Sequence, residues 1–265
     1  MNHMAKIFLQ KEYSMRLSGC LILTFSLATS IASAKCEFKN APTILQQDGK
    51  TIDMLFAEKM SPEFWQASDL GTPALNSYRN WASLHTNVDQ IFLLKRERAI
   101  FAKIPEPKDV MLFDQIIEGK IGTLTLSACI EDLLFERHLQ NVGRSETLAE
   151  FGGAILEKES TQEMKAYFIT TAEEDIGVGV SDIILHSIEK DKENGFVFRT
   201  FIHNHTFVFD NEDIGGANIG STPDYEAAAD YEKRFQLQSE RITNGFHTLQ
   251  YSMNDVHKAL AILRP

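Results

Sequence analysis

The spacing of apolar and polar residues predicts alternating helices and short strands in the second half of the chain. Residues 130–139 place apolar side chains among charged ones at the spacing of an amphipathic helix. Apolar runs at 151–156 and 166–171 predict strands, and residues 180–188 predict a second helix. Residues 196–202 carry the strongest strand signal, because this run is rich in β-branched and aromatic residues.

A long helix is predicted over residues 225–242, which contain alanines and charged residues but no glycine or proline. The Ser-Thr-Pro sequence at 221–223 is typical of a helix start. Earlier in the chain, the Pro-Glu-Pro sequence at 105–107 interrupts a helical pattern. We therefore expect a helical N-terminal region at 35–118 and an α/β (α+β) domain at 119–265, in which helices flank a mixed β-sheet.

The chain begins with the features of a secretion signal. Three basic residues precede an apolar run at 20–31, and Ala32-Ser33-Ala34 then has the small-x-small form of a signal peptidase site. We expect residues 1–34 to be a signal peptide that is cleaved after Ala34, with Met15 as an alternative start. The apolar run is shorter than the roughly 20 residues of a membrane-spanning helix. The mature protein is therefore expected to be secreted or periplasmic, without a transmembrane span.

The net charge expected of the mature chain limits the classes of partner that it can bind, and two cysteines remain in it. Removing residues 1–34 takes away three basic residues and one acidic residue, which moves the formal net charge from −11 to −13. Nucleic acids and anionic membranes repel such a chain, so we expect no nucleic-acid partner. Cys36 and Cys129 remain, and an oxidising compartment permits them to pair. A disulfide and two buried free thiols are both open, as is the oligomeric state.

Two histidines at the end of the strongest strand are candidate metal ligands. His203 and His205 lie two residues apart, and in an extended segment such residues project from one face about 6.6 Å apart. Two imidazoles at this spacing can converge on one zinc ion with bonds of about 2.1 Å. A carboxylate at the start of the following helix, Asp224, can supply a third ligand. By themselves, a His-x-His pair can be structural, and Ser221 and Asp224 are adequately explained as helix caps.

Taken together, these residues resemble the pattern of the JAMM (MPN+) zinc metalloprotease family. The pattern is a glutamate on an early strand, then His-x-His, then Ser-x-x-Asp; here Glu150 precedes the strand at 151–156 and the later motifs follow in order. The resemblance implies that His203, His205 and Asp224 bind Zn²⁺, with a water as the fourth ligand. It further implies that Glu150 takes a proton from that water, and that Ser221 donates a hydrogen bond to the oxyanion.

The resemblance covers about residues 129–255 and implies a JAMM-like metallohydrolase domain within 119–265. The implied function is that of a secreted zinc-dependent peptidase or isopeptidase, in which zinc-bound water activated by Glu150 attacks a peptide or isopeptide bond. The expected partner is a peptide or protein substrate, with cell-wall peptides as one class. The alternative is a non-catalytic, JAMM-like protein-binding module in the cell envelope.

The segment between the second histidine and the serine departs from the family pattern. It spans fifteen residues, 206–220, which is longer than the family usually has. Its glycines fit a mobile flap, with Phe207 and Phe209 contacting substrate; alternatively, the insertion displaces the serine and abolishes activity. Three acidic residues of the insertion are alternative ligands in place of Asp224. They are Asp210, Glu212 and Asp213.

Overall fold

The computed structural model describes six stretches of the chain, all within one compact unit that begins at Lys35. They are residues 36–68, 70–104, 107–143, 149–173, 179–207 and 215–264. The expected signal peptide at 1–34 lies outside these described residues, as do Phe209 and the three alternative acidic ligands. None of the helices in the described stretches is long and apolar enough to cross a membrane.

Eight strands form one sheet in the order β1-β2-β5-β4-β6-β7-β8-β3. The strands are β1 (Thr43–Asp48), β2 (Thr51–Lys59), β3 (Thr123–Leu126), β4 (Phe151–Lys158), β5 (Glu163–Thr171), β6 (Val197–Asn204), β7 (Ser239–Thr243) and β8 (His247–Ser252). The helices are η1 (Pro62–Trp65), α1 (Pro73–His85), α2 (Gln90–Phe101), α3 (Pro107–Ile117), α4 (Cys129–Val142), α5 (Asp182–Glu193), α6 (Thr222–Phe235) and α7 (Met253–Leu263). The predicted fold class, a mixed sheet flanked by helices, is confirmed.

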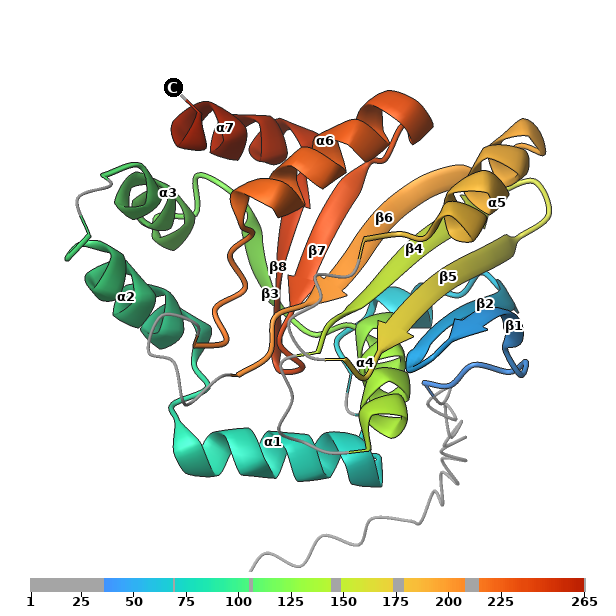
Figure 1. The fold of residues 1–265 in the computed structure, drawn as a ribbon, viewed down its shortest axis with the longest axis horizontal. Helices are drawn as coiled ribbons and strands as arrows, with labels where there is room; N and C mark the ends of the chain where they lie inside the picture. The colour runs from blue at the N-terminus through green and yellow to red at the C-terminus, as the bar shows by residue number, and fades with distance from the viewer. Residues whose placement is uncertain are drawn as a thin grey trace, which may run out of the picture. The chain divides into compact units, whose positions relative to one another are not determined.

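The pairing of β6 with β7 is parallel, whereas the other strand pairs of the sheet are antiparallel. A parallel pair needs a crossover connection, because a tight turn cannot join strands that run the same way. Helix α6 provides that crossover (Figure 1). The carboxyl end of β6 and the start of α6 are therefore brought to the same edge of the sheet.

Helices cover both faces of the sheet. Figure 1 shows α5, α6 and α7 on one side, with α1 and α4 on the other. Side chains of β4 alternate between these faces: a Cβ at Gly153 would lie 2.8 Å from Leu134 of α4, whereas Gly152 faces Phe201. The ring of Phe201 in turn lies 5.4 Å from that of Tyr231 on α6.

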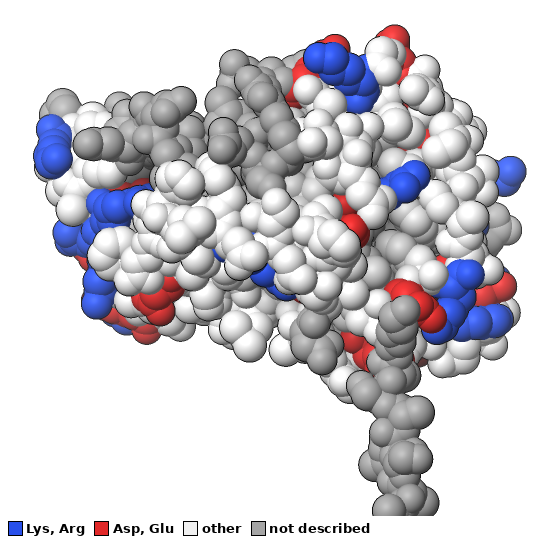
Figure 2. All heavy atoms as spheres, turned by 90° about the horizontal axis from the view of Figure 1, so that it is seen from below, with Lys and Arg blue, Asp and Glu red and all other residues white. Residues whose placement is uncertain are grey.

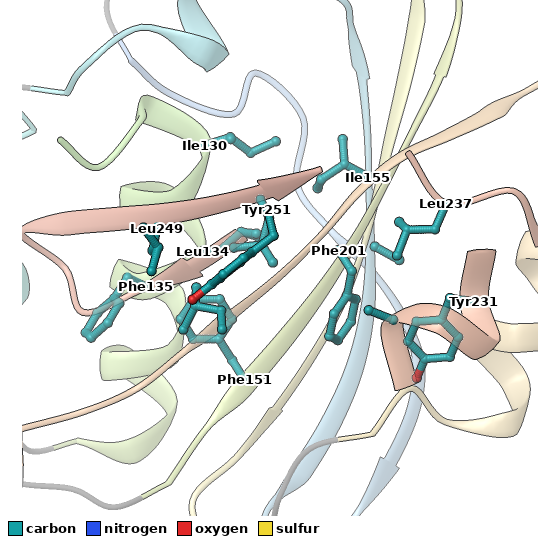
Figure 3. Close-up of a cluster of buried hydrophobic side chains, with 14 of the residues drawn as sticks. Ile130, Leu134, Phe135, Phe151, Ile155, Phe201, Tyr231, Leu237, Leu249 and Tyr251 are labelled. Carbon is teal, nitrogen blue, oxygen red and sulfur yellow. The ribbon is translucent and has the colours of Figure 1, made fainter. Parts of the chain in front are cut away.

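The core consists of large apolar side chains on both sides of the strands. In Figure 3 the α4 residues Leu134 and Phe135 approach Phe151 of β4, and Tyr231 of α6 lies near Phe201 of β6. Phe135 and Phe151 are fully buried and meet edge to face at 5.7 Å, a favoured geometry for aromatic pairs. These contacts hold α4 and α6 against opposite faces of β4 and β6.

The surface carries its charges in small groups. In the view of Figure 2, Lys and Arg side chains lie close to Asp and Glu side chains, and uncharged surface separates the groups. The ion pair between Lys39 and Glu37 is one example, at 2.5 Å.

The N-terminal region is only partly helical, which corrects the prediction for residues 35–118. Its first third forms β1 and β2, and β2 pairs with β5 along the whole of Thr51–Lys59. Met54 and Phe56 of β2 are buried in the shared core. The sequence of β2 contains helix-favouring residues, but pairing and burial against β5 outweigh the intrinsic propensity. Strands β1 and β2 of this region therefore belong to the same sheet as the later strands.

The long helix predicted at 225–242 is also wrong at its C-terminal end. Helix α6 stops at Phe235, and Gln236 adopts a left-handed conformation with φ 57°. Residues Ser239–Thr243 instead form β7, which lies between β6 and β8. Two neighbouring strands supply hydrogen bonds on both sides, so tertiary pairing overrides a helical pattern.

Cys36 and Cys129 form a disulfide. Cys36 and Cys129 are bonded with their Cα atoms 5.7 Å apart and 93 residues apart in sequence. The bond joins the segment that precedes β1 to the first residue of α4. Of the two possibilities left open by the sequence, the structure has the disulfide.

Replacing both Cys36 and Cys129 by alanine is expected to lower the free energy of unfolding by about 2–5 kcal/mol, because a cross-link over this separation restricts the unfolded chain. Denaturant unfolding of the oxidised protein and the double variant measures the difference. The matched control is the wild type under reducing conditions, which should unfold at the same denaturant concentration as the variant. Equal midpoints for the oxidised protein and the variant would contradict this role.

Candidate metal centre

Strand β6 delivers the two histidines to the α6 side of the sheet. His203 pairs with Gly152 of β4, where a Cβ would lie 3.1 Å from the ring of Phe201 on the same face. His205 follows the strand, and its backbone N–H donates to the carbonyl of Thr243 at 2.9 Å. The two ring centroids lie 5.2 Å apart. The sheet therefore holds both imidazoles on one side, as the spacing predicts.

The start of α6 supplies a carboxylate and a hydroxyl. Ser221 caps the helix and forms a capping box with Asp224. The Ser221 hydroxyl donates to Oδ2 of Asp224 at 2.7 Å, and the Ser221 N–H donates to the same oxygen at 2.7 Å. The insertion at 206–220 therefore leaves the serine next to the candidate carboxylate ligand.

The three candidate ligands converge. His203 Nε2 lies 3.9 Å from Asp224 Oδ1, and His205 Nε2 lies 3.6 Å from Asp224 Oδ2. Their ligand atoms all lie within 4.8 Å of one another. Bonds of about 2.1 Å in a tetrahedral arrangement separate ligand atoms by about 3.4 Å, so small side-chain shifts complete such a site. This group could hold a metal ion.

Burial of the cluster supports a metal and leaves one side open. Both ring nitrogens of His203 are buried and have no hydrogen-bond partner in the described part of the chain. A buried polar atom without a partner costs free energy, and a metal bond would recover it for one of the two nitrogens, Nε2, which faces Asp224. The side chains of His205 and Asp224 stay 19% and 26% exposed, so these two candidate ligands remain in contact with solvent.

The two histidines of the cluster differ in pKa. Burial lowers the pKa of His203 to about 4, because the carboxylate of Asp224 compensates only in part. Burial also acts on His205, but Asp224 and then Glu150 outweigh it and raise its pKa to about 9. The pKa of Asp224 is lowered, because both imidazoles outweigh the effect of burial. The metal-free cluster is therefore an ion pair between His205 and Asp224 beside a neutral His203.

Glu150 lies at the same edge, immediately before β4. Its carboxylate is close enough to raise the pKa of His205. The backbone on both sides of Glu150 is held: Asn204 accepts from the Phe151 N–H at 2.6 Å, and His138 contacts the Ala149 carbonyl at 3.0 Å. Four residues of the sequence motif, His203, His205, Ser221 and Asp224, therefore lie together. The carboxylate of Glu150 is near enough to change the pKa of His205.

Sequence reasoning missed Glu240, which lies behind His203. Its Oε1 lies 3.8 Å from His203 Nδ1, too far for a hydrogen bond. Burial raises the pKa of Glu240 well above its usual range, with Asp224 adding to the effect. The sequence pattern assigned this residue to a helix, and the β-branched Ile242 and Thr243 were the strand signal that could have revealed it.

Two points within the insertion are joined. Phe207 forms a β-bridge with Gly215, and its side chain is 2% exposed. Its ring packs edge to face on Phe246 at 5.8 Å. The prediction that Phe207 contacts substrate is therefore wrong, because the ring is part of the core.

No known protein family, curated protein or solved structure matches this chain. The resemblance to the JAMM pattern accordingly rests on the motif residues alone and stays a prediction.

Burial of His138 is expected to make the protein acid-sensitive. Burial lowers its pKa from 6.5 to about 4, while its contact with the Ala149 carbonyl partly opposes that. Between these two pH values, the His138 ring is protonated in the unfolded chain and neutral in the folded chain. Above pH 6.5 the His138 ring is neutral in both the folded and the unfolded chain, so it does not lower the free energy of unfolding. As the pH drops towards 4, protonation of the unfolded chain lowers the free energy of unfolding by about 3 kcal/mol.

Denaturant unfolding of the metal-free protein across this pH range tests the effect. His138→Gln should flatten the fall in the free energy of unfolding. His186→Gln is the matched control, because the His186 side chain is 83% exposed, and this variant should follow the wild-type curve. Parallel curves for His138→Gln and the wild type would refute the assignment.

Proposed function

We propose that this protein is a secreted, zinc-dependent peptidase or isopeptidase. The observation that carries the proposal is the convergence of His203, His205 and Asp224 at one edge of the sheet. Glu150 and Ser221 add a base and a hydrogen-bond donor beside them. The order of these residues along the chain resembles the JAMM pattern and supports the same reaction class.

The donor set favours zinc among the common metals. Two imidazole nitrogens and one carboxylate oxygen match the three-ligand catalytic zinc sites, whereas calcium and magnesium prefer oxygen ligands alone. When bound, zinc supplies a Lewis acid and lowers the pKa of water towards about 7. His203 and His205 would both offer Nε2, since these atoms face Asp224.

Glu150 acts as the proton carrier in the proposed reaction. Its carboxylate accepts a proton from the attacking water, and it delivers that proton to the amine that leaves when the C–N bond breaks. Water and amide thereby yield a carboxylic acid and an amine, with no other reactant. The anchored backbone on both sides of Glu150 supports this role, because a base must stay in place between the two transfers.

Ser221 stabilises the oxyanion in the proposed reaction. In the resting structure its hydroxyl donates to Asp224 Oδ2, and the residue is exposed. Rotation about its side-chain bond turns the same hydrogen towards a substrate carbonyl oxygen. The remaining hydrogen bond from the Ser221 N–H keeps Asp224 in place during that rotation. A donor in this position typically contributes about 3–4 kcal/mol to transition-state binding.

The proposed substrate is a peptide or protein of the cell envelope, with cell-wall peptides as one class. The acidic mature chain, with a formal net charge of −13, supports a neutral or basic substrate over an anionic polymer. A chain that binds no metal and hydrolyses no amide would instead be a non-catalytic binding module.

The purified mature protein is expected to bind one zinc ion, and His203→Ala should weaken zinc binding at least about 100-fold, because one of three ligands is lost. Elemental analysis and competition with a chelator measure both values. His257→Ala is the matched control, because His257 contacts Glu232 on the surface between α6 and α7. Equal zinc affinity for wild type and His203→Ala would rule out this site.

Glu150→Gln is expected to keep zinc but to lower the hydrolysis rate by about 10²–10⁴-fold, since the amide cannot carry the proton. The assay is mass spectrometry of a peptide and isopeptide library, which detects both products of each cleaved bond. Glu159→Gln, in the turn that follows the distant end of β4, is the control and should be fully active, because this side chain is 76% exposed. Full activity of Glu150→Gln would exclude the mechanism, and no cleavage by the wild type would exclude the function.

A further inference from the structure

A short segment at the end of the insertion is held by helix α2. Glu97 Oε1 accepts from the N–H groups of Gly215 at 2.8 Å and Ala217 at 3.3 Å. The neighbouring Arg96 donates from Nη2 to the Gly215 carbonyl at 2.7 Å. Adjacent residues of one helix therefore bind the donors and the acceptor of the same backbone segment.

The segment is also bonded on its other side. The side-chain amide of Asn244 donates to the Gly216 carbonyl at 2.8 Å and to Gln90 of α2 at 3.0 Å. The Ala217 carbonyl lies 3.3 Å from Nδ1 of His205. Hydrogen bonds thus engage both N–H groups and all three carbonyls named here, which leaves the segment little freedom to move.

The contact with Ala217 orients the ring of His205. A carbonyl can only accept a hydrogen bond, so Nδ1 of His205 carries the hydrogen in this contact. Nε2 is then the nitrogen that faces Asp224, at 3.6 Å. A metal-ligating histidine is commonly oriented through its other ring nitrogen in this way.

Glu97 occupies an unusual position for a carboxylate. It lies on the buried face of α2 with Gln90, Leu93 and Leu94, and it is 5% exposed. A buried carboxylate is costly unless its oxygens are hydrogen-bonded, and both recorded partners of Glu97 Oε1 belong to the segment beside His205. The helix therefore places a costly group where it fixes the backbone next to a candidate ligand.

The two glycines permit this close packing. A Cβ at Gly215 would lie 1.4 Å from Nη2 of Arg96. Gly216 has φ +80°, and a Cβ there would lie 2.5 Å from the ring of Phe207. The absence of side chains at Gly215 and Gly216 therefore lets Arg96 and Phe207 pack directly against the backbone of the insertion.

We propose that Glu97 is a positioning residue for His205: by holding the backbone of Gly215 and Ala217, it fixes the carbonyl that orients the imidazole towards the metal. The proposal rests on the proposed metal function. It assigns α2 and the end of the insertion a direct part in the site, as a support for one ligand.

Three variants test the proposal in the full mature chain. Glu97→Met removes the acceptor at similar length, and Glu97→Gln keeps an acceptor oxygen. Gly215→Ala displaces Arg96 and disturbs the segment while Glu97 stays intact. Glu157→Met is the matched control, because Glu157 is also a buried glutamate and accepts from Trp65 and Arg199 at the far end of β4.

Two measurements are made on each variant. Zinc affinity comes from competition with a chelator. The hydrogen bond from His205 Nδ1 to the Ala217 carbonyl is followed in metal-free protein by ¹⁵N NMR, as an Nδ1–H signal that exchanges slowly with water. The signal is assigned with His205→Gln. The NMR readout needs neither zinc nor hydrolysis, so it decides the positioning role even where the proposed function fails.

Glu97→Met and Gly215→Ala are expected to weaken zinc binding about 10–100-fold and to remove the slowly exchanging Nδ1–H signal of His205. Glu97→Gln should stay close to the wild type, and Glu157→Met should lower thermal stability without changing either readout. An unchanged Nδ1–H signal of His205 in both Glu97→Met and Gly215→Ala would overturn the proposal. If Glu97→Met does not fold, two variants still test the proposal: the His205 signal should be lost in Gly215→Ala and kept in Glu97→Gln. Zinc binding by none of the proteins, wild type included, would instead overturn the proposed function.

Discussion

The parallel pairing of β6 with β7 is the constraint on which the site depends. Parallel strands require a crossover, and here α6 makes it, so the chain leaves the end of β6 and re-enters a helix at the same edge of the sheet. His203 is therefore close to Asp224 although twenty residues separate them in sequence. The long insertion is tolerated because the edges that it connects are fixed by the sheet and the helix.

The buried polar groups around this edge are connected by backbone hydrogen bonds more than by ion pairs. Asn204 shows why this matters: strand alternation turns its side chain away from the two histidines, and it accepts from the Phe151 N–H on the neighbouring strand. The residue between the ligands thus ties the histidine strand to the strand that follows Glu150. The side-chain amide of Asn204 is uncharged, so it joins the two strands without the free-energy cost of burying a charge. A buried carboxylate, by contrast, needs hydrogen-bond donors.

The sequence predicted the local elements where one pattern dominated. The strand at 196–202 and the helix at 130–139 are present because their side chains favour the structures that packing also selects. Residues 51–59 and 239–243 were mispredicted, since their helix-favouring residues are outweighed by neighbouring strands that lie far away in sequence. Such pairing leaves little mark within a short window of the chain: in β7 the mark is limited to the β-branched Ile242 and Thr243.

The candidate ligands could be proposed from their spacing, but the residues that support them could not. His203 and His205 lie two apart on a clear strand, which fixes their side of the sheet. Glu97 comes from a helix more than a hundred residues earlier and acts through backbone N–H groups, which carry no sequence signature. Only its burial reveals it: a carboxylate on the apolar face of a helix requires donors, and here the donors are the backbone beside His205.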